Sequence, residues 1–443
     1  MTCKTFLNIS KNCGNEFIII QNDEIEPFIN LLIRNISINI CDLKENQKLI
    51  FYETIGNIIN HEKDFMKKKS LIEQFINFFH DNWIDIIKKV QNNPQLFKNS
   101  EIYKSLYNII LVNCKLFQSM KNDYFIYFSQ YFDFILQAFE FYTKEINNFY
   151  NVNILSNDNI SFFILINKNI IELLCILISN INDINIIENN LFSQFERIIK
   201  CYNTDIKNKF SNVLKLFKIV ISKIQDSEKD KTYVQLIWIN ICLPTLHLIK
   251  NDLQKYEIHM QYLLDIFHLL LINKFECLMI IQQFKFNQDV IDIILDSIKI
   301  NNPNFIQKSI EILLLILKNM NEKKKIENID IMIPFYIKYY LTILSFIFSN
   351  LINSLNTYGF KEKLEILQTL IQIIQDNILN DGILQIETKN KQIVIDKFCE
   401  EIFKISKYIN EEKINNFCEQ LFNNCHNFHN FKTIFRDLII TIK

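Results

Sequence analysis

The scarcity of turn-forming residues constrains this chain most. Its 443 residues include only four glycines, Gly14, Gly56, Gly359 and Gly382, and five prolines. An all-β chain needs many turns rich in Gly, Pro and Asn and a sustained alternation of apolar and polar residues. Neither is present, whereas apolar residues recur at helical spacing along almost the whole chain. The sequence therefore predicts an all-α fold.

Residues 71–90, LIEQFINFFHDNWIDIIKKV, show this spacing clearly. Their apolar positions follow the i, i+3, i+4, i+7 rule of an amphipathic helix: Ile72, Phe75, Ile76, Phe79, Trp83, Ile86, Ile87 and Val90. Three further apolar residues widen the stripe beyond a coiled-coil seam, so we expect this helix to contact more than one neighbour. Trp83 and Trp238 both lie in such apolar contexts and are predicted to be core residues.

Similar segments recur and are joined by short polar connections, such as NNP at 92–94 and at 301–303. Pairing at intervals of about 40–45 residues is typical of HEAT-type α-solenoids. The sequence predicts one continuous solenoid over residues 1–443. Within the stretch CDLKENQKLIFYETIGNII at 41–59, CDL closes one helix, and KENQKLIFYETIGNII forms the helix that returns alongside it in a hairpin. The expected helices lie near 24–40, 46–60, 66–91, 99–119, 122–149, 160–181, 186–201, 207–225, 231–250, 256–273, 286–300, 303–320, 334–354, 360–379, 391–409, 411–424 and 428–442.

Charge and cysteine usage narrow the class of protein. The chain carries 48 Lys+Arg against 49 Asp+Glu, without the basic excess of a nucleic-acid-binding protein. Its 49% hydrophobic residues are enough for a large core. The 11 cysteines are dispersed, and the N-terminal segment MTCKTFLNISKNC lacks the pattern of a secretory signal, so we expect reduced thiols inside a cell.

The uncharged run Tyr339–Phe360 is the strongest candidate for a membrane span. It contains Ser345, Ser349 and three asparagines at helical spacing. A spanning helix needs about 20 predominantly apolar residues. We therefore expect a buried amphipathic helix and no membrane partner.

Motifs for catalysis or cofactor binding are not found. The glycines are too far apart to form the phosphate-binding loops G-x-x-x-x-G-K-[ST] and G-x-G-x-x-G or the nucleophile elbow G-x-S-x-G. The stretch HEKDF at His61 has Phe65 where a zinc protease requires a second histidine. No catalytic residue, no cofactor and no enzymatic activity are predicted.

A group of possible zinc ligands occurs in CEQLFNNCHNFH: Cys418, Cys425, His426 and His429. Thiolate and imidazole are the usual ligands, but this spacing matches no standard structural zinc site. The favoured interpretation is two buried cysteines and two loop histidines, without a metal.

Other polar features have simple structural interpretations. His259 and His268 are nine residues apart and imply no shared site. The basic runs Lys67–Lys69 and Lys323–Lys325 fit solvated helix ends, and a patch for a partner protein remains the alternative.

Several segments, in the same order along the chain, resemble the exportin-1 (chromosome region maintenance) family. MTCKTFLNISKNCGNEF is similar to a family segment that opens with Met-Ala-Cys-Asp-Thr-Phe. EPFINLLIRNISINICDL and FYETIGNII match the next helical hairpin, and NWIDIIKKV carries the family's Trp-Asp pattern at Trp83 and Asp85.

The resemblance continues to the end of the chain. YEIHMQYLLDIFHLLLINKFECLM carries a Tyr-x-x-His feature at Tyr256 and His259, and VIDIILDSI carries Leu-Asp-Ser-Ile at 295–298. FKTIFRDLIITIK resembles the family's Phe-Lys-x-x-x-Arg-Asp-Phe-Leu-Val-Gln-Ile-Lys, with Phe431 and Arg436 at matching positions.

This resemblance implies a ring-like HEAT solenoid that acts as a non-enzymatic receptor for leucine-rich nuclear export signals. Cargo and Ran-GTP would favour the same conformation and so promote each other's binding. The signal would dock as an amphipathic segment in an apolar groove between helices. The implied partners also include nucleoporins, with shuttling between nucleus and cytoplasm and no direct contact with nucleic acid.

The match begins inside the family sequence, so the chain is expected to be the C-terminal half of a longer receptor. The N-terminal Ran-binding region, the acidic loop and the reactive groove cysteine have no counterpart here, and the family's last helix and acidic tail are also missing. Only Met1 matches a residue of the signal groove, as a remnant of its floor. The alternative is a stand-alone HEAT scaffold that binds a different partner.

Overall fold

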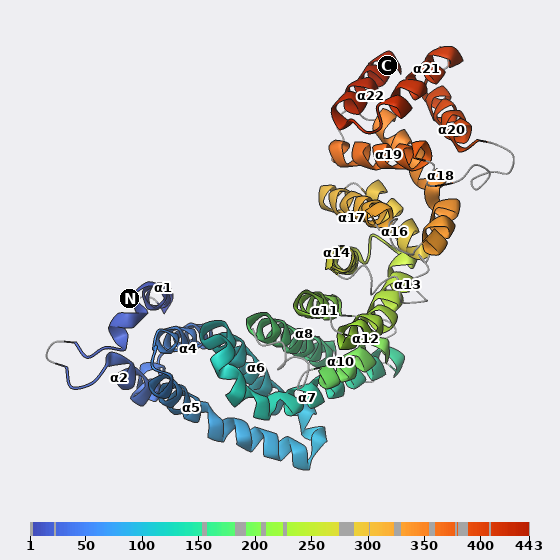
Figure 1. Cartoon of the computed structure of the whole chain (residues 1–443). Coiled ribbons are helices and arrows are strands. Elements are labelled where there is room, and N and C mark those ends of the chain that lie inside the picture. The colour runs from blue at the N-terminus through green and yellow to red at the C-terminus, as the bar shows by residue number, and fades with distance from the viewer. Residues whose placement is uncertain are drawn as a thin grey trace. The chain divides into compact units, whose positions relative to one another are not determined.

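The computed structural model describes residues 3–21, 24–152, 157–181, 192–204, 210–224, 228–273, 288–300, 302–322, 329–353, 359–376, 379, 389–406 and 409–442. Contacts divide the chain into two compact units, Met1–Ile224 and Gln225–Lys443, which are described separately. Within the described residues both units are built from helices and contain no strand (Figure 1). The prediction of an all-α solenoid is confirmed.

The first unit consists of two rows of helices. In the first row each helix packs on the next: α1 (Cys3–Cys13), α4 (Glu45–Asn60), α6 (Ser100–Met120), α8 (Asn157–Asn180) and α11 (Ser211–Lys223). The second row contains α2 (Phe28–Arg34), α5 (Phe65–Asn92), α7 (Phe125–Val152) and α10 (Phe192–Thr204), with the single turn α3 (Ile36–Asn39) after α2. Chain neighbours such as α7 and α8 pair across the rows, as expected for helical hairpins.

The second unit repeats this plan. Its first row runs α14 (Glu257–Asn273), α17 (Pro303–Glu322) and α19 (Phe360–Gln375), and α21 (Glu411–Asn423) and α22 (Phe428–Ile442) pack on α19. Its other row contains α12 (Glu228–Ile237), α13 (Leu243–Asn251), α16 (Gln288–Lys299), α18 (Ile329–Asn353) and α20 (Asn390–Ile405).

The core of each unit is a strip of apolar side chains between its rows. Ile55, Leu106 and Ile110 in the first unit are fully buried. Each such side chain contributes about 1.5–3 kcal/mol by leaving water. Trp83 and Trp238 are 3% and 0% exposed, so their prediction as core residues is confirmed.

Asparagine and aspartate side chains define several helix starts. Asn99 Oδ1 accepts hydrogen bonds from the backbone N–H groups of Glu101 and Ile102 at the start of α6. Asp64 caps α5 and Asn410 caps α21 in the same way. These caps satisfy backbone N–H groups that have no partner within the helix. A helix can therefore start directly after a short polar connection that contains no glycine.

Two expected helices are interrupted. The segment expected at 24–40 is divided at Asn35 into α2 and α3, because Asn35 leaves helical geometry at φ −99° and ψ 22°. The segment expected at 231–250 contains a π-helical turn, Trp238–Cys242. Pro244 follows two residues after this turn. Its ring cannot accommodate the carbonyl four residues earlier, so a wider turn relieves this clash.

One observed helix was not expected, and one expected helix is described only in part. Helix α1 was not predicted, although Cys3–Cys13 forms a regular amphipathic helix. The first part of the helix expected at 186–201 lies outside the described residues, and α10 begins at Phe192.

Among the residues that the structure describes, three helical segments are long and apolar enough to cross a membrane by length and composition: Asn159–Asn180, Lys231–Lys250 and Pro334–Asn353. About half of each is buried inside the structure, at 56%, 44% and 56% respectively. The last segment belongs to α18, where Tyr340 and Phe348 are fully buried and the helix packs on α19 and α20. The expected burial of one face is observed, with Ile337 exposed on the other.

Candidate functional site

The one partner-binding residue suggested by the family resemblance, Met1, lies outside the described residues. Its assignment to a groove floor therefore stays a prediction. The described residues instead offer a cavity in the first unit, between α4, α5 and α6, with a volume of about 400 Å³. Volumes of about 300–1,000 Å³ are typical of binding sites for small ligands.

Aromatic rings form the wall of this cavity, which is lined by Tyr52, Phe78, Phe79, Trp83 and Tyr107. Phe79 and Trp83 are four residues apart on α5, and their rings stack with centroids 5.3 Å apart. Tyr52 of α4 meets Phe79 edge-on at 4.9 Å. Helical spacing thus places two α5 rings beside a ring of the neighbouring row.

Two hydrogen-bond donors of this wall have no protein partner. Among the described residues, neither the Tyr52 hydroxyl nor Nε1 of Trp83 makes a hydrogen bond, and neither is a fully enclosed unpaired atom. Burial and the carboxylate of Glu45 raise the pKa of Tyr52 to about 12, so this hydroxyl remains a donor at neutral pH.

The remainder of the lining mixes aliphatic residues, Leu49, Ile109, Leu111 and Val112, with polar residues whose charges balance. Its charged residues are Glu45 and Lys48, which form an ion pair of 2.8 Å on α4. Asn46, Asn82 and Asn108 contribute side-chain amides from the three helices. Each amide can both donate and accept a hydrogen bond, so the cavity combines aromatic and aliphatic surface with a few polar groups and no net charge.

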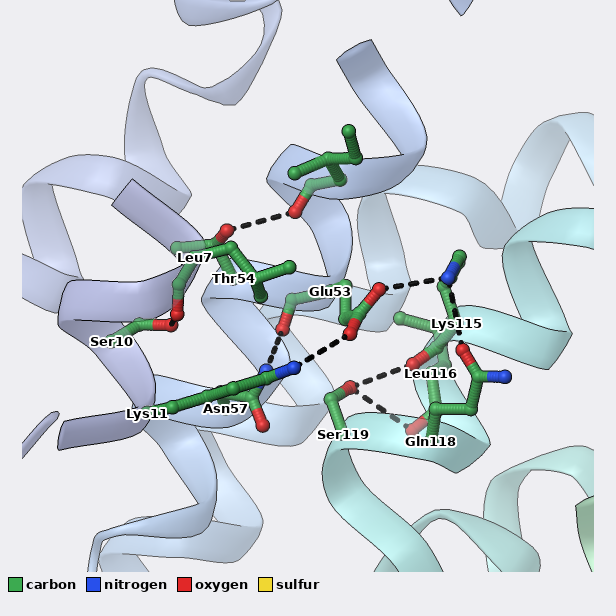
Figure 2. A network of polar contacts seen from close by, with 11 residues as sticks. Leu7, Ser10, Lys11, Glu53, Thr54, Asn57, Lys115, Leu116, Gln118 and Ser119 are labelled. Carbon is green, nitrogen blue, oxygen red and sulfur yellow. Dashed lines mark hydrogen bonds and ion pairs between the residues drawn. The ribbon is translucent and has the colours of Figure 1, made fainter. Parts of the chain in front are cut away.

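A buried carboxylate joins the helices beside this cavity. Glu53 of α4 is only 8% exposed and lies 2.8 Å from Nζ of Lys115 in α6. Its other oxygen lies 3.4 Å from Nζ of Lys11 in α1. Figure 2 shows the two lysines reaching Glu53 from either side. One carboxylate therefore connects three successive helices of the first row.

A second buried carboxylate lies in the other unit. Glu401 of α20 accepts hydrogen bonds from the hydroxyls of Ser345 and Ser349 in α18, at 2.8 and 2.7 Å. Lys404 Nζ lies 2.7 Å from the same carboxylate. Burial opposes ionisation of Glu401, but these hydrogen bonds outweigh it and lower its pKa. The polar residues of α18 thus bind another helix.

The possible zinc ligands are separated by their environments. Cys418 and Cys425 are fully buried, and burial raises the pKa of both thiols. His426 is exposed and lies 3.2 Å from Asp376. In the part of the chain that the structure describes, no three His, Cys, Asp or Glu residues are grouped to hold a metal ion.

The other polar features also have local partners. Lys68 pairs with Asp123 at 2.5 Å, and Lys69 lies 3.9 Å from Glu73. The run Lys323–Lys325 lies outside the described residues. His268 lies 3.8 Å from Glu311 of α17, and its pKa is lowered by burial and by Lys308.

Sequence reasoning assigned Trp83 and Phe79 to the core but did not find the cavity beside them. Its one usable signal was the wide apolar stripe of 71–90, which indicated contact with more than one helix. The opening depends on how α4, α5 and α6 are placed relative to one another, and helical spacing alone does not define that.

Comparison with known proteins identifies the family. A family model described as CRM1 C terminal matches residues 127–443. Exportin-1 of Dictyostelium discoideum is 24% identical over 100% of this chain and 42% of its own length. Exportin-1 of Drosophila melanogaster is 23% identical and protein EXPORTIN 1B of Arabidopsis thaliana is 22% identical to this chain. Both alignments cover 100% of this chain and 41% of the relative's own length.

The chain spans less than half the length of these relatives. Among solved structures, an engineered protein aligns over 98% of the chain with a TM-score of 0.40 and 8% identity, too weak a likeness to support any argument. The family model, in contrast, covers more than two thirds of the sequence. The chain therefore belongs to the CRM1 C-terminal family.

Proposed function

We propose that the chain is the C-terminal part of a nuclear export receptor, a non-enzymatic carrier of proteins with leucine-rich export signals. The observation that carries this proposal is the family match together with alignment of the whole chain to exportin-1 proteins. A two-row helical array suits the role, because a chain of stacked hairpins offers long surfaces for protein partners.

In this proposal the receptor binds cargo together with Ran-GTP, contacts nucleoporins and shuttles between nucleus and cytoplasm. Cargo and Ran-GTP would each favour one conformation of the solenoid, and the gain in affinity is then reciprocal. The complete receptor performs this function, and this chain supplies the C-terminal solenoid, with Met1 as a remnant of the floor of the signal groove.

The first test is the size of the native protein, by immunoblot of whole-cell extract with an antibody against residues 61–91. We expect a band of roughly twice the 53.2 kDa of this chain, because the chain covers 42% of a relative. A band at 53.2 kDa would instead favour the stand-alone scaffold.

The second test is binding by the native protein captured with that antibody. A labelled leucine-rich signal peptide should be retained with Ran-GTP and released with Ran-GDP. Equal retention with either form of Ran would contradict the export function.

A further inference from the structure

A strained residue lies in the turn that joins α6 to α7. Lys121 has φ 53° and ψ −129°, and among the described residues no other non-glycine residue has a positive φ. These angles are those of the first central position of a type II′ turn, which glycine usually occupies. A residue with a β-carbon is strained there, and it keeps this conformation only where the surrounding structure holds it.

The turn is fixed at both ends by buried side chains. Met120, the last residue of α6, and Tyr124, at the end of the 3-10 turn Lys121–Tyr124, are both fully buried. The Tyr124 hydroxyl donates a hydrogen bond to Oδ1 of Asn113 in α6 at 2.6 Å. Because neither end can shift easily, the strain falls on the short connection between them.

Lys68 of α5 holds the middle of this turn. Its Nζ lies 2.5 Å from a carboxylate oxygen of Asp123. The same Nζ donates a hydrogen bond of 3.0 Å to Oδ1 of Asn60, the last residue of α4. One ammonium group therefore joins the α4–α5 turn to the α6–α7 turn, which are the tips of two consecutive helical hairpins.

We propose that Lys68, through Asp123 and Asn60, is a latch between these hairpins that keeps the Lys121 turn in its strained conformation. When the latch opens, Lys121 returns to a negative φ, the 3-10 turn loosens and the tips of the two hairpins separate. The junction between the hairpins is thus adjustable, and its apolar core does not fix it alone. This proposal does not depend on the export function.

Dissolved salt should act on the latch. The Lys68 side chain is 17% exposed and that of Asp123 is 44% exposed, so ions reach the carboxylate and screen its attraction for the ammonium group. High salt is therefore expected to favour the open latch.

The test follows hydrogen exchange of the Phe125 amide in the full chain, by mass spectrometry that resolves single amides. This N–H donates to the carbonyl oxygen of Asn122, so its exchange reports on the closed turn. Lys68→Met should accelerate the exchange at least about tenfold, the effect of losing hydrogen bonds to a charged group. The matched control is Lys69→Met, which should stay within about twofold of the parent, because Lys69 is half exposed and lies 3.9 Å from Glu73 of its own helix.

A second substitution separates the strain from the loss of a contact. Lys121→Gly relieves the strain and leaves the latch intact, since glycine adopts a positive φ without a steric penalty. It should slow exchange of the Phe125 amide at least about threefold. In the double variant with Lys68→Met it should bring the exchange back to within about threefold of the parent.

The proposal is overturned if Lys68→Met and Lys69→Met exchange alike, or if Lys121→Gly fails to slow the exchange in both backgrounds. Sodium chloride at about 0.5 M should accelerate the exchange of the parent at least about threefold and that of Lys68→Met less than about twofold. An equal response of these two proteins to salt would also contradict the latch.

Discussion

Gly56 of α4 lies directly against Ser119 of α6, so that a β-carbon at position 56 would overlap both Oγ and Cβ of the serine. Ser119 is itself fixed, since its hydroxyl donates to the backbone carbonyl oxygen of Lys115 at 2.9 Å. The absence of a side chain at Gly56 thus sets how closely these two helices of the first row approach.

Gly56→Ala is expected to destabilise the first unit. The steric overlap costs about 1–3 kcal/mol, and the better helix propensity of alanine returns about 1 kcal/mol. We expect a net loss of about 1 kcal/mol in the free energy of unfolding, measured by urea denaturation. In the double variant with Ser119→Gly the loss should be smaller than the sum of the single losses. Simple additivity would show that the helices do not touch at this point.

Glu53→Gln is expected to lower the free energy of unfolding by about 1–3 kcal/mol, the usual effect of losing hydrogen bonds to a charged group. The loss should exceed that of Lys11→Met, because Lys11 is half exposed and its contact is 3.4 Å. The control is Asp85→Asn in the exposed pair Lys89–Asp85, which should change stability by less than about 0.5 kcal/mol. Equal effects at Glu53 and Asp85 would contradict the role of Glu53 in joining three helices.

Glu401 should make the stability of the second unit sensitive to acid. Its folded-state pKa is lowered, so the unfolded chain binds its proton more readily. The stabilisation is therefore present above the unfolded glutamate pKa of about 4.3 and is lost as the pH falls through the folded value. Chemical denaturation between pH 6 and pH 3 should show this decline, and Glu401→Gln should flatten it. A slope unaffected by the substitution would rule out Glu401 as its source.

His268 should give a second pH dependence nearer neutrality. Burial and Lys308 lower its folded pKa, against the smaller opposing effects of Glu311 and Asp265. The neutral imidazole is thus favoured on folding, and stability should fall as the pH drops below about 6.5. His268→Gln should remove this decline, measured by thermal unfolding between pH 7.5 and pH 5.5. If His268→Gln instead loses more stability than the parent protein as the pH falls, protonation of His268 stabilises the folded state, which would contradict this prediction.

The sequence was informative wherever burial follows the helical period. The stripe Ile72–Val90 of α5 is buried as predicted at each of its eight positions, and the hairpin around 41–59 has its returning helix at Glu45–Asn60. These features depend on local periodicity, which one sequence records directly.

Features that depend on contacts between distant segments could not be predicted. Glu53 and Lys115 are 62 positions apart, and nothing in the spacing of either residue indicates the other. The π-helical turn at Trp238 follows from the competition between Pro244 and the preceding carbonyls, which the apolar pattern of 231–250 conceals. The cavity likewise arises from the relative positions of three helices.

The burial of the cysteines has a practical consequence for spectroscopy. Cys114, Cys175, Cys242 and Cys418 are enclosed, and burial raises the pKa of each thiol, so they react slowly with electrophiles at neutral pH. Cys13 and Cys41 are exposed. A maleimide dye should therefore attach to these two before the enclosed thiols, which labels the end of α1 and the segment after α3 without any engineered cysteine.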